Sequence, residues 1–146
     1  MNSKKIILTL IICLFTFHIN AQDKSKSKSI IANSSSIRQY FEKEELEKMQ
    51  KGELINHYIE RVKLIIDTLP YIALATKPGI TMADIGIPEN TDNRKALDTQ
   101  QEATKEFMES TVDFQSKILP YSDKVALITA IMYYQNIIKE LHLINE

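Results

Sequence analysis

The stretch "INHYIERVKLIIDTLP", from Ile55 to Pro70, places apolar residues at the spacing of an α-helix. The apolar positions recur every three or four residues, at Ile55, Tyr58, Ile59, Val62, Ile65, Ile66 and Leu69. Side chains at this spacing share one face of a helix, and such a face is stable only when another element covers it. Pro70 lacks a backbone donor and crowds the preceding turn. We therefore expect an amphipathic helix that ends at Pro70.

The segment before this helix also has a helical pattern, and we expect it to begin at Ser36. Ser36 and Gln39 have the spacing of a capping box, in which each side chain accepts a hydrogen bond from the other's backbone N–H. Acidic and basic residues mixed through residues 42–51 predict a solvated face. Gly52 is expected to end or kink this first helix.

A third helix is expected to run to Leu119 from Asp92 or Asn93, either of which can cap it. Its predicted apolar side, which should face the core, consists of Leu97, Thr104, Phe107, Met108, Thr111, Phe114 and Ile118. Acidic and basic residues cover the remaining positions, as on a helix that is buried on one side only.

Ser122 is expected to cap a fourth helix after Pro120. Between Val125 and Ile138 this helix is apolar nearly all round, but the run is shorter than the ~20 residues that span a bilayer. A helix with this pattern lies either at the centre of its domain or half-covered by a partner. No segment alternates like a β-strand, so we predict one all-α domain, residues 36–146, folded as an antiparallel up-down bundle of about four helices.

The tripeptide Leu-Pro-Tyr occurs twice, starting at Leu69 and at Leu119. Each copy is expected to end a helix, because proline cannot continue one. A duplicated helical hairpin is the alternative, but it would require similarity over a longer period than the flanking residues show.

The first residues have the pattern of a secretory signal peptide. Lys4 and Lys5 precede an apolar block, Ile6 to Phe17, and Ala21 is a small residue at the expected cleavage point. Cleavage after Ala21 would remove residues 1–21 and export the chain to the periplasm or the outside of the cell. Residues 22–35 are rich in lysine and serine and predict a flexible polar tether.

Composition excludes several classes of function. The formal net charge is −1, and the leader removes two lysines, so the exported chain has no basic stripe for nucleic acid. The single cysteine, Cys13, lies in the leader, which leaves no disulfide, thiol nucleophile or thiolate ligand. No serine nucleophile motif, zinc-protease motif or glycine-rich phosphate loop is present. We predict a protein that is not an enzyme and carries no cofactor.

Glu53, His57 and Glu60 form the one candidate metal site, since their spacing places them on one helix face. Helical di-iron sites require Glu-x-x-His on two helices, whereas here the order is His-x-x-Glu and it occurs once. A solvated face is the simpler interpretation, because lone acidic residues and histidines usually contact water.

Two features are candidate surfaces for a macromolecular partner. Residues 77–93 form a long loop in which Thr81 and Asp84 have capping-box spacing and Gly86 can close one helical turn. Its apolar residues can either cap the bundle end or contact a partner, and the fourth helix adds one exposed aromatic candidate. The predicted partner-binding residues are Ile80, Met82, Ile85, Ile87 and Tyr133.

We expect a small exported protein that binds a macromolecule of the bacterial cell envelope, as an accessory, inhibitor or immunity-type factor, or that binds a second copy of itself. The first alternative is a carrier of a small apolar ligand, with a pocket in the bundle lined by Tyr58, Phe107, Phe114 and Tyr134. The second alternative is a metal-dependent envelope enzyme that uses the face from Glu53 to Glu60.

Overall fold

The structure is a computed structural model that describes residues 27–31, 37 and 39–143, and the predicted signal peptide lies outside these ranges. The described chain is all-α, as predicted, and contains no strand; Ser29 and Thr81 form one isolated bridge. The helices are α2 (Lys43–Lys48), α3 (Lys51–Thr68), α4 (Thr91–Ile118) and α5 (Lys124–Leu143), and the short 3-10 helices are η1 (Leu69–Tyr71), η2 (Ala83–Ile85) and η3 (Leu119–Tyr121). None of the described helices is both long and apolar enough to cross a bilayer.

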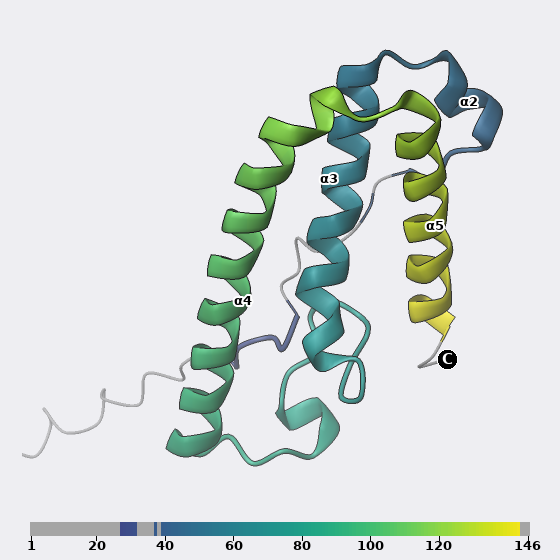
Figure 1. Cartoon of the computed structure of the whole chain (residues 1–146). Coiled ribbons are helices and arrows are strands. Elements are labelled where there is room, and N and C mark those ends of the chain that lie inside the picture. The colour runs from purple at the N-terminus through teal and green to yellow at the C-terminus, as the bar shows by residue number, and fades with distance from the viewer. Residues whose placement is uncertain (1–26, 32–36, 38, 144–146) are drawn as a thin grey trace, which may run out of the picture.

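Helix α3 is the centre of the fold. It packs against α4 and against α5, while α4 and α5 make no comparable contact with each other in the described residues. Figure 1 shows the three long helices side by side, each running opposite to the next along the chain. Helix α2 is short and packs on α5. Helix α5 lies at one edge of this layer, and α3 lies in the middle. A central position therefore does not explain why α5 is apolar nearly all round.

The boundary between the first two helices differs from the prediction. Residues 39–42 are not helical, α2 has only six residues, and Ser36 lies outside the described ranges. Helix α3 starts earlier than expected because Gln50 and Glu53 form a capping box, in which Glu53 accepts from the Gln50 backbone N–H at 2.8 Å. Gly52 therefore lies inside the first turn of α3 and does not end a helix.

Two predicted caps are displaced by a few residues. Helix α4 is capped by Asn90, whose side-chain oxygen accepts from Asn93 N at 2.8 Å, and not by Asp92 or Asn93. At α5 the Asp123 carboxylate accepts from the backbone N–H groups of the first turn, whereas the Ser122 hydroxyl donates to Leu119 O. In both cases a side-chain oxygen satisfies N–H groups that the helix itself cannot pair.

Both Leu-Pro-Tyr copies end a long helix, as predicted, and each forms a 3-10 turn there. Their side chains, however, have opposite roles. In η1 the tyrosine, Tyr71, is 5% exposed and Leu69 is 50% exposed. In η3 Leu119 packs against the core, and Tyr121 is 87% exposed. The same backbone bend therefore buries its tyrosine at one end of the molecule and exposes its tyrosine to solvent at the other.

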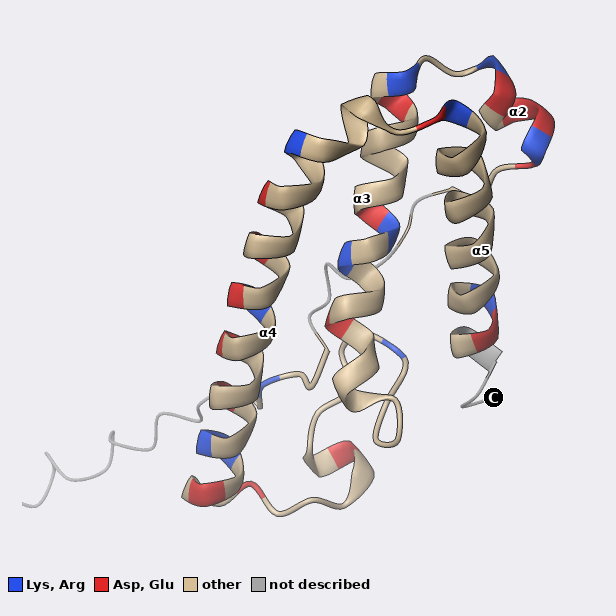
Figure 2. Cartoon of the chain, in the orientation of Figure 1, with Lys and Arg blue, Asp and Glu red and all other residues tan. Residues whose placement is uncertain are grey.

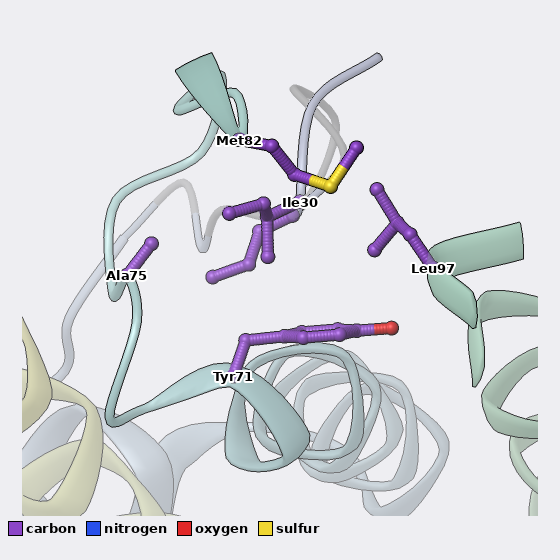
Figure 3. Packing of buried hydrophobic residues seen from close by; sticks show 6 residues of the cluster. Ile30, Tyr71, Ala75, Met82 and Leu97 are labelled. Carbon is purple, nitrogen blue, oxygen red and sulfur yellow. The ribbon is translucent and has the colours of Figure 1, made fainter. Parts of the chain in front are cut away.

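Residues 27–31, which the sequence placed in a flexible tether, pack into the fold. Ile30 and Ile31 are buried, and Ile30 N donates to Ile80 O at 2.8 Å. The side-chain amide of Gln101 on α4 donates to two carbonyls of this segment. Figure 3 shows Ile30 beside Met82, over the ring of Tyr71. The tether prediction is wrong for these five residues. The segment contains two adjacent isoleucines, whose burial stabilises the packed form, whereas a wholly polar linker would gain no such stabilisation.

A buried polar network joins the chain before α2 to α3 and α5. Arg61 on α3 is fully buried and donates to the carbonyls of His57 and Gln39 and to Gln135 Oε1, the last at 2.6 Å. Gln135 on α5 pairs with both backbone groups of Phe41, at 3.0 Å each. The Phe41 ring lies 5.4 Å from the guanidinium carbon and contacts the His57 ring. Burial lowers the pKa of Arg61, and the nearby Glu60 carboxylate opposes this change.

Replacement of Gln135 by Ala should lower the free energy of unfolding by about 3 kcal/mol or more, because it leaves buried groups of Arg61 and Phe41 without partners. Asn136→Ala is the matched control, since Asn136 is exposed on the same helix and should change the value by less than about 0.5 kcal/mol. Urea unfolding followed by circular dichroism measures both. Equal effects of the two substitutions would show that the network is not important for stability.

Candidate functional site

The three candidate metal ligands do not form a common site. Glu53 is exposed and caps α3, while His57 Nδ1 lies 3.6 Å from Glu60 Oε2. The same Glu60 oxygen is 3.4 Å from the buried Arg61 guanidinium, which already balances its charge. No group of three or more metal-ligating side chains occurs among the described residues.

The loop residues predicted to bind a partner turn inward. Met82 is 5% exposed in the cluster around Tyr71, and Ile80, Ile85 and Ile87 are partly buried against that cluster. The predicted capping box is present, since Thr81 and Asp84 accept from each other's backbone N–H, and Gly86 closes the turn with φ 76°. As placed, the loop caps one end of the helical layer, and its use by a partner stays a prediction.

The aromatic residues predicted to line an internal pocket separate into two groups. Tyr58 on α3 and Tyr134 on α5 lie with ring centroids 5.5 Å apart, and burial together with the Tyr134 hydroxyl raises the pKa of Tyr58 to about 12. Phe107 and Phe114 on α4 are 62% and 63% exposed. Both rings therefore lie on the outside of the molecule.

Two clefts lie beside the first half of α4, and Tyr71 lies between them. One cleft, of about 400 Å³, has Lys28, Asp67 and Lys105 in its wall. The other, of about 510 Å³, has no charged residue in its wall; its lining includes Leu74, Asn93, Ala96 and Gln100. We call the second one the uncharged cleft.

The hydroxyl of Tyr71 has no hydrogen-bond partner among the described residues, although it is buried. Burial raises the pKa of Tyr71, and the nearby Thr104 hydroxyl opposes the rise, but that hydroxyl donates its proton to Gln100 O at 2.8 Å. Figure 3 shows the Tyr71 hydroxyl pointing toward the part of α4 that carries Leu97.

Helix α4 has two stripes of uncharged residues, one on each of two adjacent sides. The inner stripe faces α3 and is buried or half-buried; it consists of Leu97, Gln101, Thr104, Met108, Thr111, Gln115 and Leu119, the last in η3. Gln115 from this stripe reaches Tyr58 on α3, where its side-chain amide lies 3.5 Å from the tyrosine oxygen.

The second stripe, which we call the outer α4 face, precedes each inner position by one residue. It consists of Ala96, Gln100, Ala103, Phe107, Ser110, Phe114 and Ile118, and all seven residues are exposed. The intervals of three and four residues repeat as in a coiled-coil seam. None of the seven residues is acidic or basic, and the charged residues of α4 that Figure 2 colours occupy other positions of its sequence. A long exposed helix face without any charge has the composition of a docking surface rather than of a solvated one.

Sequence reasoning missed this division of α4, because it placed Phe107, Phe114 and Ile118 on the core side with Leu97 and Thr104. That placement is wrong: Phe107, Phe114 and Ile118 are 62%, 63% and 50% exposed. A signal was available in the sequence, since these three positions are separated by seven and four residues and lie roughly 40–100° around the helix from Leu97 and Thr104, all on the same side. The small residues Ala96, Ala103 and Ser110 add little to a hydrophobic pattern, so the sequence does not mark them as part of an apolar face.

Comparison of the chain with protein-family models, with curated proteins and with solved structures found no match in any of the three.

Replacement of Tyr71 by Phe should raise the free energy of unfolding by about 1 kcal/mol, because an unpaired buried hydroxyl is destabilising by roughly 1–3 kcal/mol. Tyr121→Phe, at a side chain that is 87% exposed, is the matched control and should have no effect. Urea unfolding again provides the measurement. A loss of stability in Tyr71→Phe would reveal a hydrogen-bond partner of the hydroxyl.

Proposed function

We propose that this protein is a small exported helical factor, without catalytic activity, that acts by binding another protein through the outer α4 face. The observation that carries the proposal is the exposure of Phe107, Phe114 and Ile118 on one uncharged stripe. Isolated exposed apolar residues are common on soluble proteins, but a contiguous row of them marks an interaction site.

The exposed area of the outer α4 face and the neighbouring Tyr121 supports the proposal that a protein docks there. Burial of one aromatic side chain removes roughly 150–250 Å² from water. Phe107, Phe114 and the neighbouring Tyr121, which is 87% exposed, therefore still present on the order of 400 Å². The rest of the outer α4 face raises this to on the order of 700 Å², close to the ~800 Å² that each partner buries in a standard interface.

The chemistry of the surface defines the partner. A seam of small and aromatic residues at intervals of three and four accepts the side chains of a second helix, as knobs into holes. The partner is therefore a protein with an exposed apolar helix face. The contacting residues of the partner are expected to be uncharged, because the outer α4 face contains no charged residue with which they could pair. The leader pattern supports a location in the bacterial cell envelope or outside the cell, where an accessory, inhibitor or immunity-type factor would act. We also propose that the helices keep their up-down order as one bundle-like unit in the exported protein.

The variant Phe107→Gln/Phe114→Gln should abolish capture of the partner from envelope extracts while the fold is retained. Glutamine preserves helix propensity and charge but removes the two largest apolar side chains from the face. Affinity purification with quantitative mass spectrometry, beside a circular-dichroism melt, measures both properties.

The matched control is Glu102→Gln/Glu109→Gln, which changes two exposed positions of α4 outside both stripes and should capture as the natural chain does. A protein retained equally by all three chains would not bind through the outer α4 face, and that outcome would contradict the proposal.

A small-ligand carrier is the second candidate, and one observation favours it. Tyr71, whose hydroxyl has no partner within the described ranges, lines the uncharged cleft of about 510 Å³, and clefts of this size hold small molecules. A carrier should show extra mass, in native mass spectrometry of the purified chain, that Tyr71→Phe reduces. A spectrum that contains only the mass of the protein, for both chains, would remove this candidate.

A further inference from the structure

We infer that residues 27–31 lie in a peptide-binding groove, from which an extended segment of a partner protein displaces them. The groove runs between residues 79–81 of the loop and the first half of α4, and the ring of Tyr71 lies beneath Ile30 (Figure 3). The segment of the partner carries a basic residue and, two positions later, a pair of adjacent aliphatic residues. This site goes beyond the proposed function, because it does not use the aromatic residues of the outer α4 face.

The backbone of the segment is held as a bound peptide is held. Ile30 N donates to Ile80 O at 2.8 Å, and Ile31 O accepts from Gly79 N at 3.2 Å. On the other side, the side-chain amide of Gln101 donates to two carbonyls of the segment, at 2.9 and 3.0 Å. Main-chain pairing with an extended segment is a common mode of peptide recognition. These hydrogen bonds use only main-chain groups of residues 27–31, so a segment of another sequence can form them.

The side chains of residues 27–31 define which segments fit the groove. Ile30 and Ile31 are 2% and 1% exposed, in the cluster that contains Tyr71. Lys28, two positions before the first isoleucine, forms an ion pair with Asp98 on α4. Main-chain hydrogen bonds contribute affinity without selecting a sequence. The selection therefore comes from the two buried aliphatic side chains and from the basic residue that precedes them.

The chain's own segment fills the groove incompletely. Ile30 and Tyr71 line both of the clefts beside α4, of about 400 and 510 Å³, so open volume borders their contact in two places. The buried Tyr71 hydroxyl has no hydrogen-bond partner in the described part of the chain. A ligand that fills this volume and pairs with the hydroxyl would bind more tightly than residues 27–31 do. The segment is therefore an exchangeable occupant of the groove.

Displacement of the segment would leave the contact between α3 and α5 in place. Ile30 and Ile31 belong to the cluster around Tyr71, whereas two other clusters join α3 to α5. A terminal segment with its own small cluster can leave and return as a local event.

A disulfide between the segment and the loop tests whether the segment has to leave before a peptide binds. Ser29 and Thr81 lie opposite each other in an antiparallel bridge, where Cβ atoms approach closely enough for a disulfide. Ser29→Cys/Thr81→Cys is made in a Cys13→Ser background, because Cys13 is the only native cysteine. The probe is a fluorescent synthetic peptide with the sequence of residues 27–31, and fluorescence anisotropy measures its binding to the full chain.

The oxidised variant should bind the peptide at least about tenfold more weakly than the same variant after reduction, because the locked segment cannot leave the groove. Ile30→Ser/Ile31→Ser should bind it at least about tenfold more tightly than the natural chain, since its own segment no longer competes at high effective concentration. A circular-dichroism melt checks the fold of each variant. If the serine variant does not fold, the comparison of the oxidised with the reduced chain decides the result.

Gln101→Ala, added to the serine variant, should weaken peptide binding about tenfold, because two hydrogen bonds to the peptide backbone are lost. Glu102→Ala in the same background is the matched control, since Glu102 is exposed and lines neither cleft, and it should have no effect. A peptide with serine in place of both isoleucines should not bind any of these chains.

Equal affinity of the oxidised and reduced forms, absence of binding to every variant, or failure of the two cysteines to form a disulfide would overturn the inference. A disulfide that joins two chains would identify the occupant as the segment of a second copy and would overturn it as well. Phe107→Gln/Phe114→Gln should leave peptide binding unchanged, so a failure of this inference and a failure of the proposed function are separate results.

Discussion

The contact between Arg61 and Gln135 is the constraint on which the arrangement of the helices depends. Burial of a guanidinium is costly unless its donors are paired, and here carbonyl oxygens from α3 and the chain before α2 and the Gln135 side chain accept from the two terminal nitrogens of Arg61, while its Nε has no partner among the described residues. Gln135 in turn holds both backbone groups of Phe41. Three separate parts of the chain therefore have to be in register before all of these groups are paired. Apolar packing alone would tolerate small shifts of α5 along α3, whereas this network permits one position.

With α3 and α5 fixed to each other, α4 has only one of the described long helices, α3, as a neighbour, and the segment 27–31 adds contacts near its first half. Its inner stripe contains threonine and glutamine as well as leucine and methionine, so its contact with α3 is less apolar than that between α3 and α5. The aromatic residues of α4 lie on the adjacent outer α4 face. A helix that exposes its largest side chains loses the stabilisation that their burial in the core would give. Burial of the same residues in an assembly would offset this loss.

The class of the fold and the positions of the long helices followed from periodicity and proline, because both signals are local. The end of α3 at Leu69-Pro70 and the end of α4 at Leu119-Pro120 were predictable for this reason. The choice of Asn90 over Asp92 as a cap was not, since neighbouring polar residues compete for the same N–H groups. The burial of Ile30 and Ile31 depends on Ile80 and Gln101, fifty or more positions away, and no local pattern reports such a contact.

The candidate site was only partly accessible to sequence reasoning for a similar reason. Phe107, Phe114 and Tyr133 were recognisable as candidates from residue type, but their exposure depends on which side of α4 or α5 meets α3. A helix with apolar residues on two adjacent sides has one broad apolar pattern in its sequence. Only the position of the neighbouring helix determines which of these sides is buried and which is exposed. The Tyr71 hydroxyl, which has no partner in the part of the chain that the structure describes, could not be predicted, because hydrogen-bond pairing is a property of the folded structure.

The segment 27–31 has a consequence for the kinetics of the molecule. Its contacts with residues 79–81 and with Gln101 close loops of about fifty residues or more, so their entropic cost is high and we expect them to form late in folding. The same contacts should be the first to open in the native state, as a local fluctuation that leaves α3, α4 and α5 associated. Each opening would bare the ring of Tyr71 and admit water to its hydroxyl, which makes this corner the natural entry point for hydrogen exchange and proteolysis.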